Sequence, residues 1–567
     1  MLRTLYLMTV IICIVPLLPG VAGVLFSSLG YIPPIGLNEL SIDGFKQLFA
    51  WQGVWQSIGL SVFSSLASSY LACIMSFAVL QSCWNSKLWK PIELLLSPLL
   101  AMPHVAFAIG FAFLFSPTGM GMRLAHTLFD GGSANQSDLA LLVKDPYALG
   151  LVVMLAFKEV PFLLLMSIPI LRQIDVSKQI KVGASLGYND KQIWWKTILP
   201  LWFNKLRFPM LAVIAYSLSV VDLALIMGPT NPPTFAVLVW QWFSDPDLSL
   251  LPRAAAGAVV LFVLASLLIA VARLVEWLVV KKCQSWQFSG RSGIALPGKT
   301  LFTSLCTMAA AMLPMLFLWS VAQRWRFPDL LPSRYSMRFW EYEWDGVMST
   351  INDSLLIAII SATSALFLAL IAHEYRLRYK LQVPGFIIAI PMLVPQLSIL
   401  FGLQVTTLYL SENSYFFWVC WSHIFFAFPF VYLSLDGPWR AFDNKLMHVA
   451  LSLGKTPLHA WMKVKLPLLF PAVLFAWAIG MSVSLAQYLP TLMLGAGRIA
   501  TITTEAVALS SGFDRRVTAI YALWQALLPL FFFSFAIAIS RFSGKKQHSK
   551  IKDSQRHESM SHKPRHP

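Results

Sequence analysis

The chain has 567 residues, of which 57% are apolar and only 12% are charged. This composition excludes a soluble protein folded around a single dry core and indicates a polytopic membrane protein. The formal net charge of +17 does not indicate a nucleic-acid partner, because the basic residues lie in loops between apolar runs and in the C-terminal tail, where membrane topology and anionic lipid account for them.

Apolar runs long enough to cross about 30 Å of hydrocarbon recur along the chain. The first begins just after Arg3 and carries no convincing small-residue cleavage site, so we expect a retained span and not a cleaved signal. The fold class is therefore predicted to be all-α, with about twelve transmembrane helices arranged as six plus six. The expected spans are 5–25, 56–80, 92–115, 148–171, 206–227, 254–280, 301–322, 351–373, 384–410, 415–435, 469–494 and 517–540.

Charged and polar residues inside these runs are candidates for a translocation path. Lys158 and Glu159 lie within the fourth run, where a charge is expensive and therefore a functional candidate. The alternative is an ion pair that only fixes helix packing, and the apolar residues at the equivalent positions of the second half leave both roles open. Asp222 and Gln487 occupy comparable places in the fifth and eleventh runs, where they either face a central pore or bond to neighbouring helices.

A polar loop occurs twice, at an offset of 267 residues, and eight of seventeen aligned positions are identical, so we treat it as an internal repeat. Each copy is predicted to form a short surface helix between a glycine of positive φ and a proline that either ends this helix or opens the next one. Its Trp and aliphatic positions form an apolar face that packs on the membrane or docks into another protein, and duplication favours docking. The matched residues are Ser185, Leu186, Gly187, Trp194, Lys196, Leu199, Pro200 and Leu201, and Ser452, Leu453, Gly454, Trp461, Lys463, Leu466, Pro467 and Leu468.

The repeat extends beyond these loops, and both halves have the same orientation, which implies a symmetry axis along the membrane normal. Spans 1 and 7 would each be the peripheral extra helix of their own half. Residues 157–175 align with 425–443, Pro103 and Gly110 match Pro395 and Gly402, and Ser57 matches Ser354. We divide the chain into 1–53 (first span and periplasmic segment), 54–280 (half 1, with the first repeated loop at 176–202), 281–349 (cytoplasmic linker, seventh span and periplasmic loop), 350–541 (half 2, with the second repeated loop at 443–468) and 542–567 (basic disordered tail).

One linker segment, Gly293–Thr300, matches the literal phosphate-loop pattern but lacks its context. Nucleotide binding by such a loop needs a preceding strand, a soluble helix after it and a curl of backbone N–H groups. Here Pro297 removes one donor and Thr300 leads into a membrane span. We judge the match spurious and predict that the chain is not an enzyme.

No metal site is expected. The four histidines of the tail are irregularly spaced in a low-complexity segment, and the six cysteines show no C-x-x-C spacing, so they resemble small core residues.

Basic residues also orient the chain. If the N-terminus is cytoplasmic, the inside segments hold thirty Lys and Arg and the outside segments eleven, which places both repeated loops and both termini in the cytoplasm.

The Gly and Leu-Pro frame of the repeated loops resembles the cytoplasmic EAA coupling loop of type I permease subunits of bacterial ABC importers. Two copies in one chain resemble the fused permeases, a group that includes thiamine, thiamine-like and ferric-iron importers. This chain departs from the family at Lys181-Val182-Gly183 and His448-Val449-Ala450, where the family usually has Glu-Ala-Ala. The resemblance implies an ATPase dimer on the cytoplasmic side that holds ATP and Mg²⁺, a periplasmic substrate-binding protein, and a location in the bacterial inner membrane.

We therefore expect a permease subunit that moves a small solute, of the thiamine-like or ferric-iron class, from periplasm to cytoplasm by alternating access. No cofactor is expected on the chain itself. The alternative is a self-sufficient secondary transporter of six plus six spans, driven by an ion gradient through its few intramembrane charges.

Overall fold

The computed structural model describes residues 2–14, 17–128, 142–380, 390–409, 414–512 and 514–561. Eleven helices in these ranges are long and apolar enough to cross a membrane, and the described strands are two short segments. This architecture confirms the predicted all-α class.

The N-terminal region and the first half form one succession of helices. They are α1 (Leu2–Ile14), α2 (Leu17–Ser28), η1 (Pro33–Ile35), α3 (Asp43–Ala50), α4 (Val54–Cys83), α5 (Trp89–Ala101), α6 (His104–Phe115), α7 (Met120–Leu128), α8 (Leu149–Ile174), α9 (Val176–Ser185), α10 (Asp190–Ile193), η2 (Trp194–Ile198), α11 (Leu199–Ser219), α12 (Asp222–Met227), α13 (Phe235–Phe243), η3 (Leu248–Leu250) and α14 (Leu251–Lys282).

The linker and the second half repeat much of this succession. They contain α15 (Gln284–Phe288), α16 (Gly298–Val321), β1 (Ala322–Arg324), β2 (Arg334–Tyr335), α17 (Arg338–Arg378), α19 (Ile390–Leu393), α20 (Gln396–Thr407), α21 (Tyr415–Ala441), α22 (Lys445–Ser452), α23 (Pro457–Ala460), η5 (Trp461–Lys465), α24 (Leu466–Leu485), α25 (Leu489–Leu494), α26 (Ile502–Ser510) and α27 (Arg515–Ser561).

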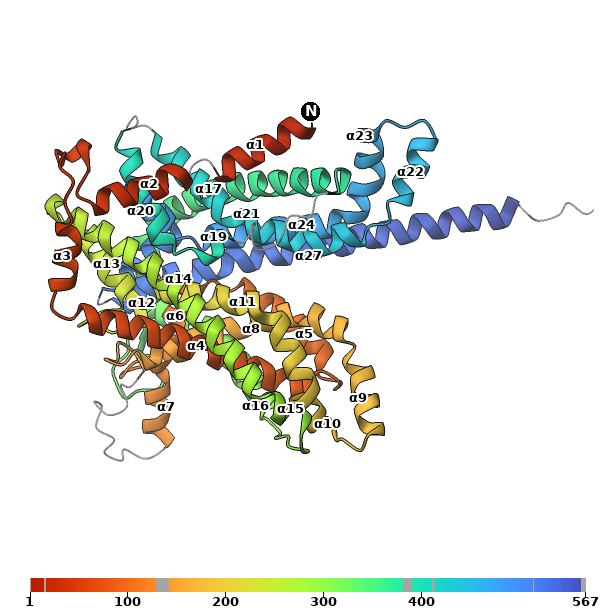
Figure 1. Ribbon diagram of the computed structural model, residues 1–567, viewed down its shortest axis with the longest axis horizontal. Helices are drawn as coiled ribbons and strands as arrows, with labels where there is room; N and C mark the ends of the chain where they lie inside the picture. Colours follow the sequence, from red (N-terminus) through yellow and green to blue (C-terminus); the bar gives the residue numbers. More distant parts are fainter. Residues whose placement is uncertain are drawn as a thin grey trace, which may run out of the picture.

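Each half is a bundle built on the same three helices. α4, α8 and α11 pack together in the first half, and α17, α21 and α24 pack together in the second. The two repeated loops, carried by α9–α10 and α22–α23, lie at the same end of the molecule, at the right of Figure 1, whereas α3 and α13 lie at the opposite end. A partner placed at that end therefore meets both loops.

The difference between twelve expected spans and eleven arises at the ninth, 384–410. Its described part forms α19 and α20, which are separated at Val394–Pro395, and residues 381–389 lie outside the described ranges. The third expected span is interrupted in the same way between α5 and α6, at Met102–Pro103. Because a proline has no N–H and disfavours helical geometry in the residue before it, a continuous apolar run need not form one straight helix.

The extra helix of each half packs on the other half, which corrects the expectation that each lies at the edge of its own. α1 contacts α17 and α2 contacts α20, while α16, which precedes the second half, contacts α4 and α6. Each also keeps a contact on its own side, α2 with α14 and α16 with α27. Trp421 of α21 donates its indole N–H to the carbonyl of Ile12 at 3.0 Å, and the rings of Tyr6 and Tyr375 stack with centroids 4.1 Å apart.

Two matched glycines explain this exchange. At Gly402 on α20 an added Cβ would lie 1.6 Å from the carbonyl oxygen of Gly20, and at Gly110 on α6 it would lie 2.9 Å from Cγ of Met312 on α16. Only a residue without a side chain lets the neighbouring helix approach so closely. The sequence match of Gly110 with Gly402 therefore marks equivalent packing sites for the two exchanged helices.

Helices α4 and α17, the first long helices of the two halves, correspond in the structure with a shift of one helical turn from the sequence match of Ser57 with Ser354. Ser61 Oγ accepts the backbone N–H of Phe235, and Ser354 Oγ accepts that of Ile502, both at 2.8 Å. Phe235 and Ile502 are the first residues of the equivalent helices α13 and α26. Ser354 therefore corresponds to Ser61 and not to Ser57. A shift of four residues keeps the same helix face inward, so the sequence pattern does not distinguish the two pairings.

The C-terminal helix is longer than expected. α27 continues to Ser561, although the composition predicts a disordered tail from residue 542. The added segment is polar and basic, but its first proline is Pro564, so no proline interrupts the helix. Residues 562–567 lie outside the described ranges.

Candidate functional site

The two repeated loops follow the same backbone path. In each, a short helix, α9 or α22, ends at a glycine in the left-handed region, with φ +81° at Gly187 and +76° at Gly454. The glycine N–H donates at 3.0 Å to the carbonyl three residues earlier, that of Ala184 or Leu451. This geometry confirms the predicted positive φ and explains why glycine ends each helix.

A capped turn follows each glycine. The side chain of Asn189 accepts the backbone N–H of Gln192, and the side chain of Thr456 accepts that of His459. Asn189 and Thr456 are 267 residues apart and differ in identity, yet both are good N-cap residues. The repeat is therefore more complete in structure than in sequence.

A π-helical turn continues each capped turn. It covers Trp194–Ile198 in the first repeated loop and Trp461–Lys465 in the second. The backbone N–H groups of Leu199 and Leu466 donate to carbonyls five residues earlier, which is the π pattern. Both leucines are half-buried.

The prolines then open the membrane helices. Pro200 and Pro467 lie in the first turn of α11 and α24, where a missing N–H costs no helical hydrogen bond. The structure thus selects the second of the two roles expected for them. The expectation that each repeated loop forms a separate short surface helix is wrong, because the second part of each loop is continuous with a membrane helix.

The exposed apolar surface of each loop comes from leucine and not from tryptophan. Leu186 is 64% exposed and Leu453 is 74% exposed. Trp194 is buried and Trp461 is half-buried within their own halves. The face that the loops offer to a partner therefore contains the leucines, whereas the tryptophans hold the loops to the helices beneath.

The serine before each leucine supports this surface. Ser185 and Ser452 donate their hydroxyls to the carbonyls of Val182 and Val449, at 2.7 and 2.8 Å. Both valines are themselves exposed, so they extend the apolar patch next to the leucine.

The two tryptophans are held by different contacts. The Trp194 ring lies edge-on to Phe77 of α4, with centroids 6.0 Å apart. The Trp461 indole N–H instead donates to Oε1 of Glu374 at 3.0 Å, and Nζ of Lys465 lies 2.5 Å from the same oxygen. Sequence reasoning missed Glu374, for which the only signal was an acidic residue just after an apolar run.

In the phosphate-loop match at 293–300, residues 293–297 have no regular secondary structure and residues 298–300 begin α16; the segment packs on α4. The N–H of Leu296 donates to Oε1 of Gln81 at 2.9 Å, and that of Gly298 donates to Oγ of Ser82 at 3.2 Å. Two backbone N–H groups that a phosphate would need are thus bonded to side chains of the chain itself, which argues against nucleotide binding by this segment.

Lys158 and Glu159 both contact the helix break between α5 and α6. Nζ of Lys158 donates to the carbonyls of Leu99 and Met102, at 3.1 and 2.6 Å, and so neutralises the negative end of α5. Glu159 Oε1 lies 3.3 Å from Nε2 of His104, the first residue of α6, where a negative charge complements the helix dipole. These contacts favour the packing role of the pair over a place in the path.

Asp222 and Gln487 lie at matched breaks in the expected spans 206–227 and 469–494. Asp222 is the first residue of α12, and Gln487 lies between α24 and α25. Gln487 is 8% exposed, and Asp222 is only partly buried. Among the described residues the Asp222 carboxylate forms no ion pair. Among the described residues, no hydrogen bond or ion pair joins Asp222 to Lys158 or Glu159.

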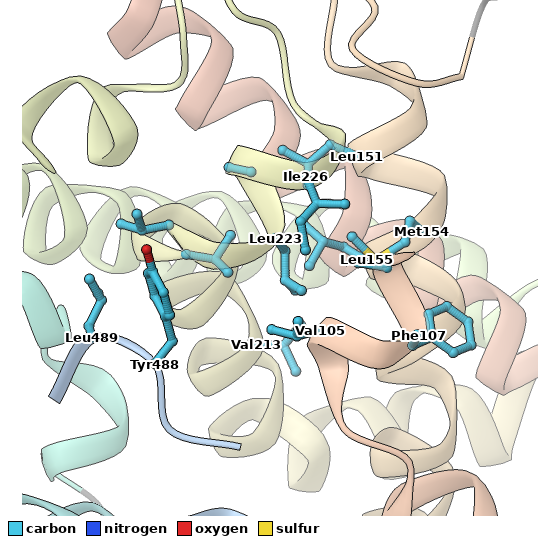
Figure 2. Close-up of a cluster of buried hydrophobic side chains, with 14 of the residues drawn as sticks. Val105, Phe107, Leu151, Met154, Leu155, Val213, Leu223, Ile226, Tyr488 and Leu489 are labelled. Carbon is cyan, nitrogen blue, oxygen red and sulfur yellow. The ribbon is translucent and has the colours of Figure 1, made fainter. Parts of the chain in front are cut away.

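Apolar side chains surround these breaks where the halves meet. Figure 2 shows Val105, Leu155 and Leu223 from three elements of the first half on one side, with Tyr488 and Leu489 of the second half across from them. These side chains are buried and belong to one hydrophobic cluster that includes residues of both halves.

No family model matches the chain. Over 508 residues, which cover 89% of the chain and 92% of the relative, it is 32% identical to the inner membrane ABC transporter permease protein YnjC of Escherichia coli K12. Over 145 residues, 25% of the chain and 54% of the relative, it is 29% identical to the spermidine/putrescine transport system permease protein PotC of the same organism. It is 27% identical over 154 residues, again 25% of the chain and 54% of the relative, to the putrescine transport system permease protein PotI.

Proposed function

Because the chain belongs to the family of ABC transporter permeases, we propose that its two repeated loops are the docking sites of two ATPase subunits. The chain is a multi-pass transport subunit of the inner membrane and not an enzyme, so ATP and Mg²⁺ would bind to the partner. The observation that carries the proposal is the recurrence of one glycine turn, one capped turn and one π turn at the same end of both halves.

Force on either loop has a direct route into the membrane. Each capped turn runs through its π turn into α11 or α24 without interruption, so displacement of the loop moves a membrane helix. Those helices end beside Asp222 and Gln487, at the breaks near the contact between the halves. Approach of two ATPase subunits would draw the loops together, tilt the halves and separate the apolar cluster of Figure 2, which opens the path toward the opposite side.

The positive-inside count supports a cytoplasmic position for both loops and both termini. ATP is available on that side, so the ATPase subunits would bind there. A periplasmic binding protein would deliver the substrate to the opposite end, where α3 and α13 lie.

The substrate is inferred to be a small, positively charged solute. Asp222 carries a carboxylate at the break between α11 and α12 and has no cationic partner among the described side chains, so it would favour a cation in the path. Thiamine-like compounds and ferric iron are both cationic, and so are the spermidine and putrescine in the names of two partial relatives. Asp222→Asn is expected to raise the KM for uptake while leaving expression intact. An unchanged KM would argue against this substrate class.

Reconstitution tests the function. Uptake into liposomes by the purified chain should require the ATPase subunits and ATP, whereas uptake driven by an ion gradient without them would establish the secondary transporter instead. A loop variant adds a second test. Gly187→Pro cannot adopt a φ of +81°, so it should abolish ATPase assembly and uptake while membrane insertion continues. Gly187→Asn, which tolerates the left-handed region, is the matched control and should retain uptake.

A further inference from the structure

The linker between the halves lies against the first repeated loop. The indole N–H of Trp195 donates to the carbonyl of Ile294 at 2.8 Å, and the side-chain amide of Gln192 donates to the carbonyl of Arg291 at 2.5 Å. Arg291 in turn donates to the carbonyl of Leu186 at 3.4 Å. Linker backbone thus contacts the loop from its glycine turn to its π turn.

Lys196 is the most deeply held residue of this contact. Its side chain is buried, its ammonium donates to the backbone carbonyls of Trp286 and of Ser289, the latter at 2.8 Å, and Nζ lies 3.9 Å from the centre of the Trp286 ring. Carbonyls and an aromatic face together replace the water that a buried ammonium loses. The equivalent Lys463 is exposed and forms no hydrogen bond or ion pair among the described residues.

The second repeated loop is held by a side chain of α17. Oε1 of Glu374 accepts the indole N–H groups of Trp439 and Trp461, each at 3.0 Å, and pairs with Lys465 at 2.5 Å. Lys465 is 3% exposed, so this ion pair is largely shielded from water. Loss of one partner from such a pair leaves an uncompensated buried charge.

In the first half, the residue equivalent to Glu374 is Gln81, and it bonds to the linker. Gln81 stands twenty residues after Ser61, as Glu374 stands twenty residues after Ser354. The Gln81 amide donates to the carbonyl of Ile294 at 2.9 Å and accepts the N–H of Leu296 at 2.9 Å. Glu374 therefore contacts the second repeated loop directly, whereas the equivalent Gln81 is connected to the first repeated loop through the linker backbone.

We propose that the linker holds the first repeated loop in position and that Glu374 holds the second, with Lys196 and Glu374 as the positioning residues. We call the group that holds each loop its brace. The proposal rests on the proposed function, because the braces matter when an ATPase pulls on the loops. Each brace ties its loop to the long helix of its own half, so each ATPase contact depends on a different set of residues. The two halves of the fused chain therefore differ in how they hold their repeated loops.

Loop-specific crosslinking tests the proposal. Single cysteines replace Leu186 or Leu453 in an otherwise cysteine-free chain, and crosslinking to the co-purified ATPase is measured for each loop. Lys196→Met should lower the yield at Leu186 about tenfold, because hydrogen bonds from a charged donor are lost, and leave the yield at Leu453 unchanged. Glu374→Gln should do the reverse. Lys463→Met, the matched control, should change neither, and Lys196→Arg, which keeps a charged donor, should retain most of the yield at Leu186.

A second readout separates positioning from stability. Lys196→Met should lower the amount of substrate moved per ATP hydrolysed, which a general loss of folded protein would not do. Equal loss at both loops, or no loss at either, would overturn the brace. Absence of crosslinks at both loops in the parent chain would overturn the ATPase-docking function itself, and the brace with it.

Discussion

Replacement of Lys158 by Met distinguishes a helix-junction role from a transport role. The ammonium donates to the carbonyls of Leu99 and Met102 at the end of α5, and the variant leaves both carbonyls without that donor. Hydrogen bonds to a charged group contribute about 1.5–3 kcal/mol each, and removal of one buried charge commonly costs about 3–5 kcal/mol, so we expect a loss of about 3–5 kcal/mol in the free energy of unfolding. Unfolding in detergent micelles measures that loss, with uptake measured on the folded fraction.

The second half supplies the control for this variant. Phe426 and Ala427 stand where the first half has Lys158 and Glu159, and both are buried. The double variant Lys158→Phe with Glu159→Ala should recover much of the lost stability, because replacing a complete set of buried charges by apolar residues is often nearly neutral. If Lys158→Met unfolds at the parent midpoint and yet abolishes uptake, the junction role is wrong and the path role is right.

Two further predictions test the packing of the halves. Gly402→Ala should force α2 away from α20 and lower the free energy of unfolding by about 1–3 kcal/mol. Gly59→Ala, whose added methyl group would face open space on α4, should be neutral or slightly stabilising. Thermal unfolding measures both variants, and equal midpoints would contradict the close packing of α2 on the second half. Ser61→Ala and Ser354→Ala should each cost about 1–3 kcal/mol by leaving a buried N–H without its acceptor, while Ser57→Ala should cost less, because the buried Ser57 hydroxyl has no hydrogen-bond partner among the described residues. Chemical denaturation measures these losses, and the opposite order would support the pairing of Ser57 with Ser354.

The repeated loops show how far the sequence predicts a functional surface. Glycine adopts positive φ without a steric penalty, and proline has a fixed φ that suits the first turn of a helix. Their recurrence at a fixed offset therefore correctly predicted the left-handed turns and offered the N-terminal role of Pro200 and Pro467 as one alternative. The burial of Trp194 was not predictable, because it depends on Phe77, more than one hundred residues earlier in the chain. Periodicity marks an apolar face but does not identify which neighbour covers it.

The helix breaks show a second limit. Val220 and Val221 continue an apolar run, so composition gives no reason to end a helix there, yet α11 stops at Ser219 and α12 begins at Asp222. The similar break at Met102–Pro103 carries a proline, and Lys158, which approaches from another helix, donates to the carbonyl of Met102. Tertiary contacts decide such breaks, and a single sequence does not contain them in readable form.

The exchange of extra helices was missed for a related reason. Hydropathy places spans along the chain but does not assign them to a half, and the matched Gly110 and Gly402 acquire meaning only when their neighbours are known. The same holds for the linker, whose resemblance to a phosphate loop concealed its contact with α4.

The distance between the two repeated loops is the most direct test of the central claim, which is that ATPase subunits move the halves through these loops. Spin labels at positions 186 and 453, both exposed, report that distance in the reconstituted complex. The distance should shorten when ATP binds to the complex and should not change when ATP is added to the chain alone. A distance that stays constant while ATP-driven uptake proceeds would contradict the account.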